Sequence, residues 1–304
     1  MIDPLSDVIA MLQPRAVHTR RISGAGRWAV AYGEFGHPSF CIVLDGSCRL
    51  AVNGHRALTI QAGDFVLMPA TPGFTISGFD SVRAVRMDPQ ASAARVGEMR
   101  YGTPRGKADV IMLGGWFEFE SPNAALLVSL LPSLVHLRDS ERLAMLVRLI
   151  GDESAERLAG RELMLTRLVE ALLIEALRAK PDEEAPPGLL RGLADAQLAR
   201  ALRQMHSHIA RSWTVAQLAS AAALSRSAFY ERFTAMVGVP PMEYLTQWRM
   251  TVARDLLRHQ ELDVSEVAQR VGYGSTSAFS VAFSRCVGQS PSRYAAGRQA
   301  DQPN

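Results

Sequence analysis

The chain has 304 residues, of which 48% are hydrophobic and 21% are charged, and its formal net charge is +3. This length and apolar content support two domains, each with a core. No apolar run approaches the roughly 18 to 20 residues of a membrane span, and the opening MIDPLSDVIA lacks the basic and apolar pattern of a signal segment. These features exclude a membrane-spanning chain and favour a soluble, cytoplasmic protein.

The first part of the chain carries closely spaced strand and turn signals. Asp-Gly and Asn-Gly between apolar runs are typical of two-residue hairpins, and they occur here as Asp45-Gly46 and Asn53-Gly54. Short strands at this spacing predict a small β-barrel or jelly roll. The expected strands are Trp28 to Tyr32, Phe40 to Leu44, Cys48 to Val52, Leu58 to Ala62 and Phe65 to Met68.

A long helix follows from Glu162 to Lys180, with one broad apolar face. That face consists of Leu165, Leu168, Val169, Leu172, Leu173 and Ala176. The charged, proline-containing segment PDEEAPPG then ends at Gly188 and reads as a linker. We therefore predict a domain over residues 1–180, a linker over 181–188 and a second domain over 189–304.

The balance of basic and acidic residues also changes at the predicted linker. From Gly188 onward there are 13 arginines, no lysine and 8 acidic residues, whereas residues 1–187 hold 20 basic and 22 acidic residues. The second domain is therefore basic, as expected of a nucleic-acid-binding domain, although this charge alone is weak support.

The stretch from Val215 to Tyr294 contains two copies of one pattern. Val215, Leu218, Ala219 and Ala222 recur 49 residues later, and positions from Ser225 to Tyr244 recur 50 residues later. The extra residue lies in the turn. Each copy reads as a short helix, a turn and a second helix, so the sequence predicts helix-turn-helix units at about 215–237 and 264–287.

The second helix of each unit has predicted ends. An N-cap serine opens it, and a left-handed glycine followed by proline closes it. These residues are Ser225 and Gly238 in the first unit, and Ser275 and Gly288 in the second. Two phenylalanines four residues apart occupy one face of each helix, which leaves the opposite face to meet DNA.

A single helix is expected between the units, from Met242 to His259. Its length is about 27 Å, somewhat less than the roughly 34 Å of one DNA turn. A rigid connection of this length could place the two second helices in successive major-groove segments.

These residues resemble the DNA-binding domain of the AraC/XylS family of bacterial transcription regulators. The matching motifs are LAxxAxLS from Leu218, GxxPxxYL from Gly238, WRMxxARDLL from Trp248, VAxxVGY from Val267 and GxSPxxY from Gly288. Five ordered motifs over about 80 residues form a specific signal. The resemblance implies promoter DNA and RNA polymerase as partners.

Two positions depart from the family pattern, because Glu231 and Val281 stand where the family usually has arginine. Glutamate can accept from cytosine N4 and valine can touch a thymine methyl, so the target should differ from typical family sites. Alternatively, Glu231 pairs with a neighbouring arginine and reads no base. The candidate DNA contacts are Arg226, Ser227, Tyr230, Glu231, Arg232, Ser275, Thr276, Ser277, Ser280, Arg285 and Arg293.

The N-terminal strands resemble the cupin-type sensor domain that precedes many AraC-family DNA-binding domains. The match includes GDxVLxP from Gly63 to Pro69 and continues through the segment Leu130-Leu131-Pro132 and the helix from Glu162 to Lys180. The resemblance implies an effector-sensing domain, and it also implies a dimerising role for that helix, although the helix could instead cover the barrel. Candidate residues for an effector pocket are Trp28, Tyr32, Phe40, Ile42 and Phe74, although the simpler interpretation is that most of them are core.

The ligands of a metal-binding cupin are missing. Such a site needs a His-x-His pair, an acidic residue and a later histidine. Here His37 is followed two residues later by Ser39, and His55 lies beside a predicted turn. We therefore expect no metal and no cofactor, and a metal-dependent cupin enzyme becomes an improbable alternative.

The three cysteines of the chain do not form a pattern that predicts a set of disulfides, which is consistent with a reducing compartment. A hairpin at Asp45-Gly46 would place Cys41 and Cys48 diagonally on one sheet face, with Cβ atoms less than about 7 to 8 Å apart. This exceeds the roughly 4 Å of a disulfide but is close enough for one after local movement. Some regulators of this architecture sense oxidants, so redox sensing stands beside the simpler reading of two buried structural cysteines.

The sequence as a whole predicts an α+β protein: a cupin-like β-barrel or jelly roll with following helices, then an all-α domain with two helix-turn-helix units joined by a helix. We interpret it as a dimeric, non-enzymatic transcription regulator that binds double-stranded promoter DNA and responds to a small molecule or a redox signal. A protein-interaction module that has lost DNA binding is the remaining alternative.

Overall fold

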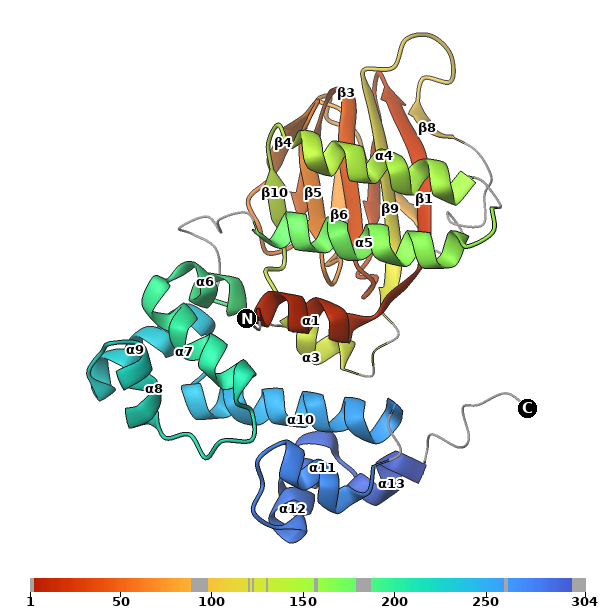
Figure 1. Cartoon of the computed structure of the whole chain (residues 1–304). Coiled ribbons are helices and arrows are strands. Elements are labelled where there is room, and N and C mark those ends of the chain that lie inside the picture. Colours follow the sequence, from red (N-terminus) through yellow and green to blue (C-terminus); the bar gives the residue numbers. More distant parts are fainter. Residues whose placement is uncertain are drawn as a thin grey trace. The chain divides into compact units, whose positions relative to one another are not determined.

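The computed structural model describes residues 3–88, 98–119, 121, 123–129, 131–155, 158–178, 187–259 and 262–296. The chain forms two compact units, and neither is one continuous stretch of sequence (Figure 1). The sheet unit comprises residues 13–120 and 131–179, and the helical unit comprises residues 1–12, 121–130 and 180–304. Most of the predicted linker, residues 181–186, lies outside the described residues, so the linker stays a prediction.

The sheet unit is a mixed ten-stranded sheet that forms a half-barrel, in agreement with the predicted α+β fold and its cupin-like β-barrel or jelly roll. Its strands run in the order β7-β2-β6-β3-β9-β1-β8, while β4 and β5 also pair with β3, and β10 pairs with β5. The pairs β1–β8 and β2–β7 are parallel, and the others are antiparallel. The strands are β1 (Pro14–Ala25), β2 (Ala29–Tyr32), β3 (Ser39–Val52), β4 (Leu58–Gln61), β5 (Phe65–Met68), β6 (Phe74–Ser77), β7 (Val85–Met87), β8 (Met99–Gly102), β9 (Val110–Phe119) and β10 (Val135–Leu137).

The predicted hairpin at Asp45-Gly46 is wrong, because β3 runs through it as one long strand. The register against β9 passes from Val43↔Met112 to Asp45↔Ile111, so β3 carries one extra residue. This is a β-bulge, and Gly46 adopts a left-handed φ of 73° there. A side chain at Gly46 would collide with the carbonyl of Asp109, so glycine is required for close approach as well as for φ. The turn at Asn53-Gly54 is present, with the His55 amide donating to the Val52 carbonyl at 3.0 Å. However, β3 and β4 pair only as far as Leu50↔Leu58, so their connection is longer than the two residues expected.

Two helices, α4 (Glu141–Ala155) and α5 (Arg161–Arg178), pack on the sheet. Figure 1 shows both helices lying across the strands. Of the predicted apolar face of α5, Leu165, Val169, Leu172, Leu173 and Ala176 are buried. That face therefore contributes to the core of the sheet unit.

The helical unit begins with the first residues of the chain. The helices α1 and α3 belong to this unit, together with the eight helices from α6 to α13. They are α1 (Pro4–Leu12), α3 (Ala124–Ser129), α6 (Leu189–Ala194), α7 (Ala196–Ser207), α8 (Val215–Ala221), α9 (Arg226–Val237), α10 (Pro241–His259), α11 (Val264–Arg270), α12 (Thr276–Val287) and α13 (Pro291–Ala296). The predicted pair of helix-turn-helix units corresponds to α8–α9 and α11–α12, joined by α10.

Candidate nucleic-acid interface and ligand cavity

The second helices of the two units, α9 and α12, have the caps that the sequence predicts. Ser225 Oγ accepts a hydrogen bond from the Ala228 amide at 3.2 Å, and Ser275 Oγ accepts one from the Ala278 amide at 3.2 Å. Gly238 and Gly288 close the helices with left-handed φ values of 91° and 80°. Both helices are therefore fixed at each end by local interactions.

The buried faces of α9 and α12 have the same aromatic geometry. Phe229 and Phe233 lie 5.5 Å apart, centroid to centroid, with an interplanar angle of 53°, and Phe279 and Phe283 repeat both values. The second phenylalanine of each pair then meets a tyrosine edge-on at 71°, 5.8 Å from Tyr244 in the first unit and 5.5 Å from Tyr294 in the second. All four phenylalanines are fully buried. Each helix is thus anchored through one face, which leaves the other face outward.

The outward face of α9 carries four of the predicted DNA contacts. Arg226, Ser227, Tyr230 and Glu231 are exposed, and 46% of the Tyr230 surface is accessible. Within the described chain, the Glu231 carboxylate forms no ion pair and no hydrogen bond.

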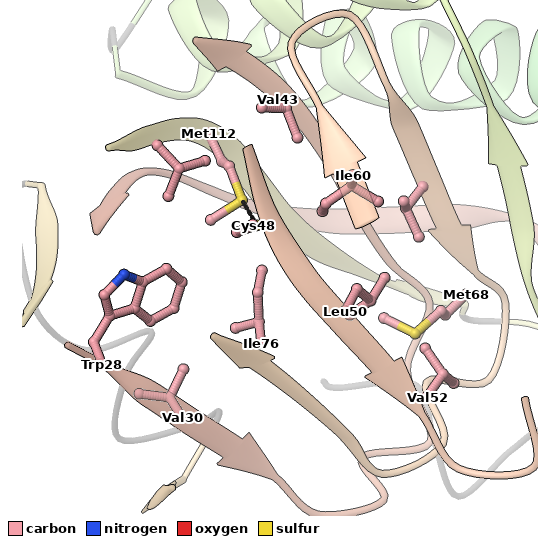
Figure 2. Close-up of a cluster of buried hydrophobic side chains, with 12 residues drawn as sticks. Trp28, Val30, Val43, Cys48, Leu50, Val52, Ile60, Met68, Ile76 and Met112 are labelled. Atoms are coloured by element: carbon pink, nitrogen blue, oxygen red, sulfur yellow. Dashed lines mark hydrogen bonds between the residues drawn. The ribbon is translucent and has the colours of Figure 1, made fainter. Parts of the chain in front are cut away.

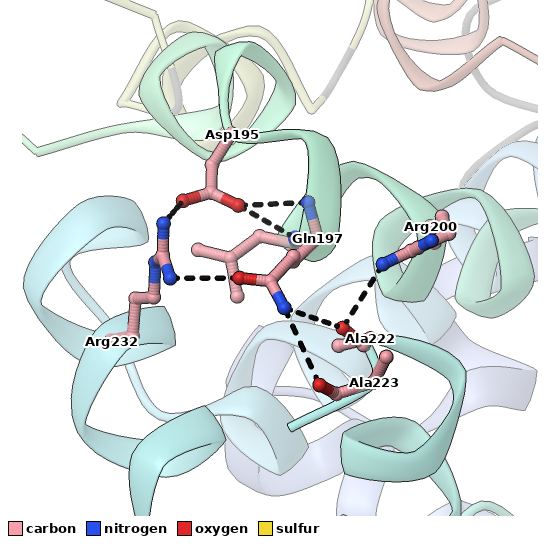
Figure 3. Close-up of polar contacts among 7 residues, drawn as sticks. Asp195, Gln197, Arg200, Ala222, Ala223 and Arg232 are labelled. Carbon is pink, nitrogen blue, oxygen red and sulfur yellow. Dashed lines mark hydrogen bonds and ion pairs between the residues drawn. The ribbon is translucent and has the colours of Figure 1, made fainter.

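The fifth predicted contact on this helix, Arg232, is exposed but already paired within the protein. Its guanidinium pairs with Asp195 at 2.5 Å and donates to Gln197 Oε1 at 2.9 Å (Figure 3). The Gln197 amide in turn donates to the carbonyls of Ala222 and Ala223, in the turn between α8 and α9. The side chain connects α9 to the start of α7 while staying half exposed, so a contact of Arg232 with DNA remains a prediction.

Asp195 is the centre of this network. It caps α7 by accepting from the amides of Gln197 and Leu198 while pairing with Arg232. Burial alone would raise the pKa of Asp195, but the two amide donors and the guanidinium outweigh it and lower the pKa. The carboxylate is therefore charged at neutral pH and holds α7 and α9 together.

On α12, exposure differs among the predicted contacts. Thr276 and Ser277 are exposed, Ser280 is half-buried, and 71% of the Val281 surface is accessible. Ser275 is exposed but already engaged as the cap. Arg285 in the last turn of α12 and Arg293 on α13 are exposed.

The helical unit also contains an aspartate–histidine–tyrosine chain. His206 of α7 is buried, with Nδ1 3.0 Å from Asp7 Oδ2 of α1 and Nε2 2.8 Å from the Tyr244 hydroxyl of α10. Its ring stacks on Trp248 at 4.2 Å. Burial lowers the pKa of His206, although Asp7 opposes that shift. The neutral ring can donate from Nδ1 to Asp7 and accept at Nε2 from Tyr244.

A second contact connects the residue before α3 to α10. The Asn123 amide donates to the Thr251 carbonyl at 3.1 Å, and both residues are buried. Sequence reasoning missed these ties, because Asp7 and His206 lie 199 residues apart and nothing local marks them as partners.

The sheet unit encloses a cavity of about 280 Å³. Three of the predicted pocket residues, Tyr32, Phe40 and Phe74, line it. Trp28 and Ile42 are buried and do not line this cavity, in keeping with the alternative that they are core residues. Figure 2 shows Trp28 within the adjoining core cluster, among Val30, Ile76 and Met112.

Much of the cavity wall comes from strands that sequence reasoning did not use. On β9, Met112 and the run Gly114 to Trp116 line it, and on β1 the run His18 to Arg20 and Ile22 do so. Gly114 lies opposite Arg20 on one side and Cys41 on the other. The period-2 pattern of MLGGWF was the available signal for β9, but it does not reveal which face is inward.

The two cysteines lie on the same strand rather than across a hairpin. Cys41 lines the cavity, and the buried Cys48 thiol lies 3.9 Å from the Met112 sulfur (Figure 2). Burial raises the pKa of the Cys41 thiol to about 12 and also raises that of Cys48. Redox sensors rely on exposed, low-pKa thiolates, so these environments favour structural thiols.

Among the described residues, no group of three or more histidine, cysteine or carboxylate side chains is arranged to hold a metal ion. His37 meets Phe35 edge-on, with ring centroids 4.8 Å apart, and its ring lies tilted against Trp116. The His55 ring is 2.9 Å from the Ser133 hydroxyl. No described helix is both long enough and apolar enough to cross a bilayer.

Two family models match the chain: a cupin model over residues 3–181 and a helix-turn-helix domain model over residues 218–297. An AraC-like transcription regulator from Streptomyces antibioticus is 36% identical, covering 96% of this chain and 98% of the relative. The transcriptional regulator AlkR from Acinetobacter baylyi is 29% identical over 83% of this chain and 86% of its own length. A crystal structure of the DNA-binding domain of AdpA with a target DNA is 33% identical over 35% of this chain and 96% of that chain, with a TM-score of 0.34.

The repeated helices and the cupin-like sheet thus occur together over nearly the full length of known regulators. The chain is accordingly not an enzyme, and it binds promoter DNA through its helix-turn-helix domain. It belongs to the family of AraC-type transcription regulators with an N-terminal cupin domain.

Proposed function

We propose that α9 and α12 each enter a major groove and that their outward residues determine the promoter sequence. One observation carries this proposal: in both helices the paired phenylalanines are buried while the opposite face is exposed. At about 1.5 Å per residue, the 19 residues of α10 span roughly 28 Å between the units. Such a separation suits two major-groove segments about one DNA turn apart.

Base readout is assigned to residues on the exposed faces of α9 and α12. On α9, Glu231 accepts a hydrogen bond from cytosine N4, and on α12, Val281 contacts a thymine methyl. The remaining residues assigned to base contacts are Ser227, Tyr230, Thr276, Ser277 and Ser280. The absence of a described partner for Glu231 favours base readout over an internal ion pair. Arg226, Arg285 and Arg293 are exposed beside these helices and bind phosphates.

Selection of DNA fragments by the purified protein tests this assignment. We expect a site with two half-elements about one turn apart. Glu231→Gln should weaken the cytosine preference in one half-element only, whereas Arg226→Ala should weaken binding to all sequences and lower the salt slope by about 1. Weak binding without sequence preference by the wild type, with and without candidate effectors, would instead favour a module that has lost DNA readout.

The cavity of the sheet unit is the proposed effector site. It is enclosed by the cupin-like sheet and lined largely by aromatic and aliphatic side chains, as small-molecule sites commonly are. A ligand that binds one arrangement of the protein better than another changes promoter occupancy. A reporter that responds equally to oxidant with wild type and Cys41→Ser would exclude the redox alternative.

We assign dimerisation to the outer surfaces of α4 and α5. Large apolar side chains remain exposed there although the inner face of α5 is buried. They are Met145 and Leu149 on α4 and Leu163 and Met164 on α5, with Leu158 between the two helices, and 47% to 64% of their surfaces are accessible. Sedimentation should give twice the 33.2 kDa chain mass, and Met145→Glu with Leu163→Glu should shift it to the monomer. A monomer for the wild type at micromolar concentrations would contradict this assignment.

The DNA-bound protein is expected to act on RNA polymerase in the cytoplasm, where promoter DNA and polymerase meet. Transcription in a purified system containing only polymerase, promoter and this protein tests it. A change in transcript level that disappears when the selected site is scrambled supports a direct effect on polymerase.

A further inference from the structure

The loop between α7 and α8 is folded tightly around its own tryptophan. The Trp213 amide donates to the Arg211 carbonyl at 2.8 Å, and the Trp213 indole donates to the His208 carbonyl at 3.1 Å. The Arg211 guanidinium lies over the Trp213 ring, 4.2 Å from its centroid. Trp213 is buried, and Thr214 directly after it caps α8. The loop is therefore fixed to the start of the first helix-turn-helix unit.

Arg249, in the middle of α10, binds this loop. Its Nε donates to the Ile209 carbonyl at 3.0 Å, and its Nη2 donates to the Arg211 carbonyl at 2.7 Å. Two donors of one planar guanidinium thus bind two carbonyls of the same loop, which fixes the orientation of the side chain as well as its position. Burial lowers the pKa of Arg249, but a guanidinium stays charged at neutral pH, so both donors are retained.

The same guanidinium also contacts the second helix-turn-helix unit. It lies over the Tyr273 ring, 5.8 Å from the centroid, in the turn between α11 and α12. Gly272, the preceding residue, has a left-handed φ of 85°. A Cβ atom there would come within 2.7 Å of Arg249 Nη2 and within 2.6 Å of the Ala210 carbonyl oxygen. Glycine therefore allows this turn to approach both the arginine of α10 and the loop before α8.

The two helix-turn-helix units are thereby joined at two points. The helix α10 connects them covalently, and the contacts of Arg249 connect the loop before α8 to the turn before α12. A single connection allows one unit to pivot about the other, whereas two connections at different points fix both distance and orientation. The second connection is termed the Arg249 bridge, and it consists of Arg249, Ile209, Arg211, Gly272 and Tyr273.

From these contacts we propose that Arg249 is a positioning residue that determines the length of DNA spacer accepted between the two half-elements. This role rests on the proposed readout by both α9 and α12, and it adds spacer length to what the protein recognises. One base pair of B-DNA advances the duplex by about 3.4 Å and rotates it by about 35°. Two units held at one distance and one angle therefore match one spacer, whereas pivoting units tolerate several.

Binding of the full-length protein to a series of duplexes measures this role. Each duplex carries the two selected half-elements, separated by the native spacer or by a spacer one base pair longer or shorter. The spacing penalty is the affinity for the native spacer divided by the affinity for an altered spacer. A smaller folded fraction or a lost phosphate contact weakens binding to every duplex alike, so it cancels from this ratio.

Substitutions of Arg249 should lower the spacing penalty. We expect a penalty of at least about tenfold for the wild type and of no more than about threefold for Arg249→Met, which keeps the long stem but no donor. Arg249→Lys keeps the charge without the planar fork and should fall between them. The charge-matched control on α10 is Arg258→Met, because the Arg258 guanidinium lies over the Tyr294 ring in the core of the second unit. This control should keep the wild-type penalty.

Two glycine variants test the Arg249 bridge without changing the arginine. Gly272→Ala places a methyl group against Ala210 and the guanidinium, and it should lower the spacing penalty. Gly288→Ala is the matched control, because Gly288 has a similar left-handed φ of 80° and a Cβ there would meet no atom within 4 Å in the part of the chain that the structure describes, apart from its chain neighbours. Its penalty should equal that of the wild type. Melting temperatures establish that each variant folds, and the glycine pair decides the test if Arg249→Met does not.

A measurement without DNA follows the two units directly. Spin labels at Tyr230→Cys on α9 and Val281→Cys on α12, in a Cys286→Ser background, report the distance between the two helices, and all three positions are exposed. With Arg249 present we expect one narrow distribution of distances. With Arg249→Met the distribution should broaden, because the units then pivot about α10.

The outcomes separate the role of Arg249 from the proposed readout. Equal spacing penalties, or equally narrow distance distributions, in wild type and folded Arg249→Met would overturn the role of Arg249. A wild-type penalty of about tenfold would then still support readout by both units. A wild type that shows no spacing penalty and binds one half-element as tightly as two would overturn both proposals.

Discussion

The two helix-turn-helix units are nearly identical inside and different outside. Their phenylalanine pairs share a centroid distance of 5.5 Å and an angle of 53°, and both helices end at a left-handed glycine. Outward, however, α9 presents Glu231 and Tyr230, whereas α12 presents Val281 and Ser277. The inner residues are constrained by packing, and the outer residues are left to vary with the DNA sequence that each helix meets.

The two helix-turn-helix units also differ in how they are connected to the other helices. The first is tied to α7 through Arg232 and Asp195, and α7 is tied to α1 through His206 and Asp7. The second has its own core, formed by α10 to α13 around Phe279 and Phe283. The first helix-turn-helix is therefore connected to several other helices, whereas the second packs on α10 and has a small core of its own.

The largest expected effect comes from the shared interior. Phe233→Ala and Phe283→Ala should each lower the free energy of unfolding by about 3–5 kcal/mol, because each removes a fully buried ring between a phenylalanine and a tyrosine. Urea denaturation measures both, with the exposed Tyr230→Ala as control. A loss below about 1 kcal/mol in either unit would show that the interiors are not equivalent.

The next effect lies on the differing exteriors. Val281→Arg should create a guanine preference in the half-element read by α12, worth about 1–3 kcal/mol of discrimination, because arginine binds guanine O6 and N7 bidentately. The measurement is repeated DNA selection, with Val281→Ala as the matched truncation. The other half-element should not change. A changed preference there instead would mean that α12 does not read the assigned half-element.

The attachment of the first unit predicts a pH dependence. Burial lowers the pKa of His206 below its usual value of 6.5, so the unfolded chain binds a proton that the folded chain does not. The stability contribution is complete above pH 6.5 and is lost as the pH falls below it, by up to about 1.4 kcal/mol per pH unit. Unfolding free energies of wild type and His206→Gln between pH 5 and 8 measure the difference. Identical slopes in the two proteins would contradict the buried neutral histidine.

The smallest expected effect concerns the ion pair that connects α9 to α7. Asp195→Asn keeps a side chain able to cap α7 but removes the charge that pairs with Arg232, and it should cost about 1 kcal/mol, because Arg232 is half exposed to solvent. Arg232→Met and the double variant complete a cycle that isolates the pair. We expect the protein to lose affinity for the DNA half-element that α9 contacts and to keep its affinity for the half-element that α12 contacts. If the two substitutions are additive, the ion pair contributes nothing.

Local signals in the sequence predicted the local features correctly. Ser225, Gly238, Ser275 and Gly288 mark the ends of α9 and α12 through interactions with residues three or four positions away, and the structure has those interactions. The turn at Asn53-Gly54 also forms through a near neighbour, since the His55 amide donates to the Val52 carbonyl. Where the partner is close in sequence, composition and spacing are sufficient.

A local signal fails where a distant segment changes its meaning. Asp45-Gly46 has the composition of a hairpin turn, yet pairing with β9 stretches it into a bulge of β3, where Gly46 is needed for its approach to Asp109. Arg232 pairs with Asp195 and Gln197 at the start of α7, two partners that its spacing in α9 does not reveal. In both cases the sequence leaves out a partner that only the tertiary structure supplies.

The sequence by itself determined the fold class, the two helix-turn-helix units, their caps and the faces that α9 and α12 bury, because these depend on periodicity and near neighbours. Only the tertiary structure decided which strands enclose the cavity, that Arg20 and Gly114 lie opposite each other, and that Asp7 reaches His206. Those arrangements depend on register and on contacts across long stretches of chain. Spacing along a sequence carries no information about which distant residues the packed core will bring together.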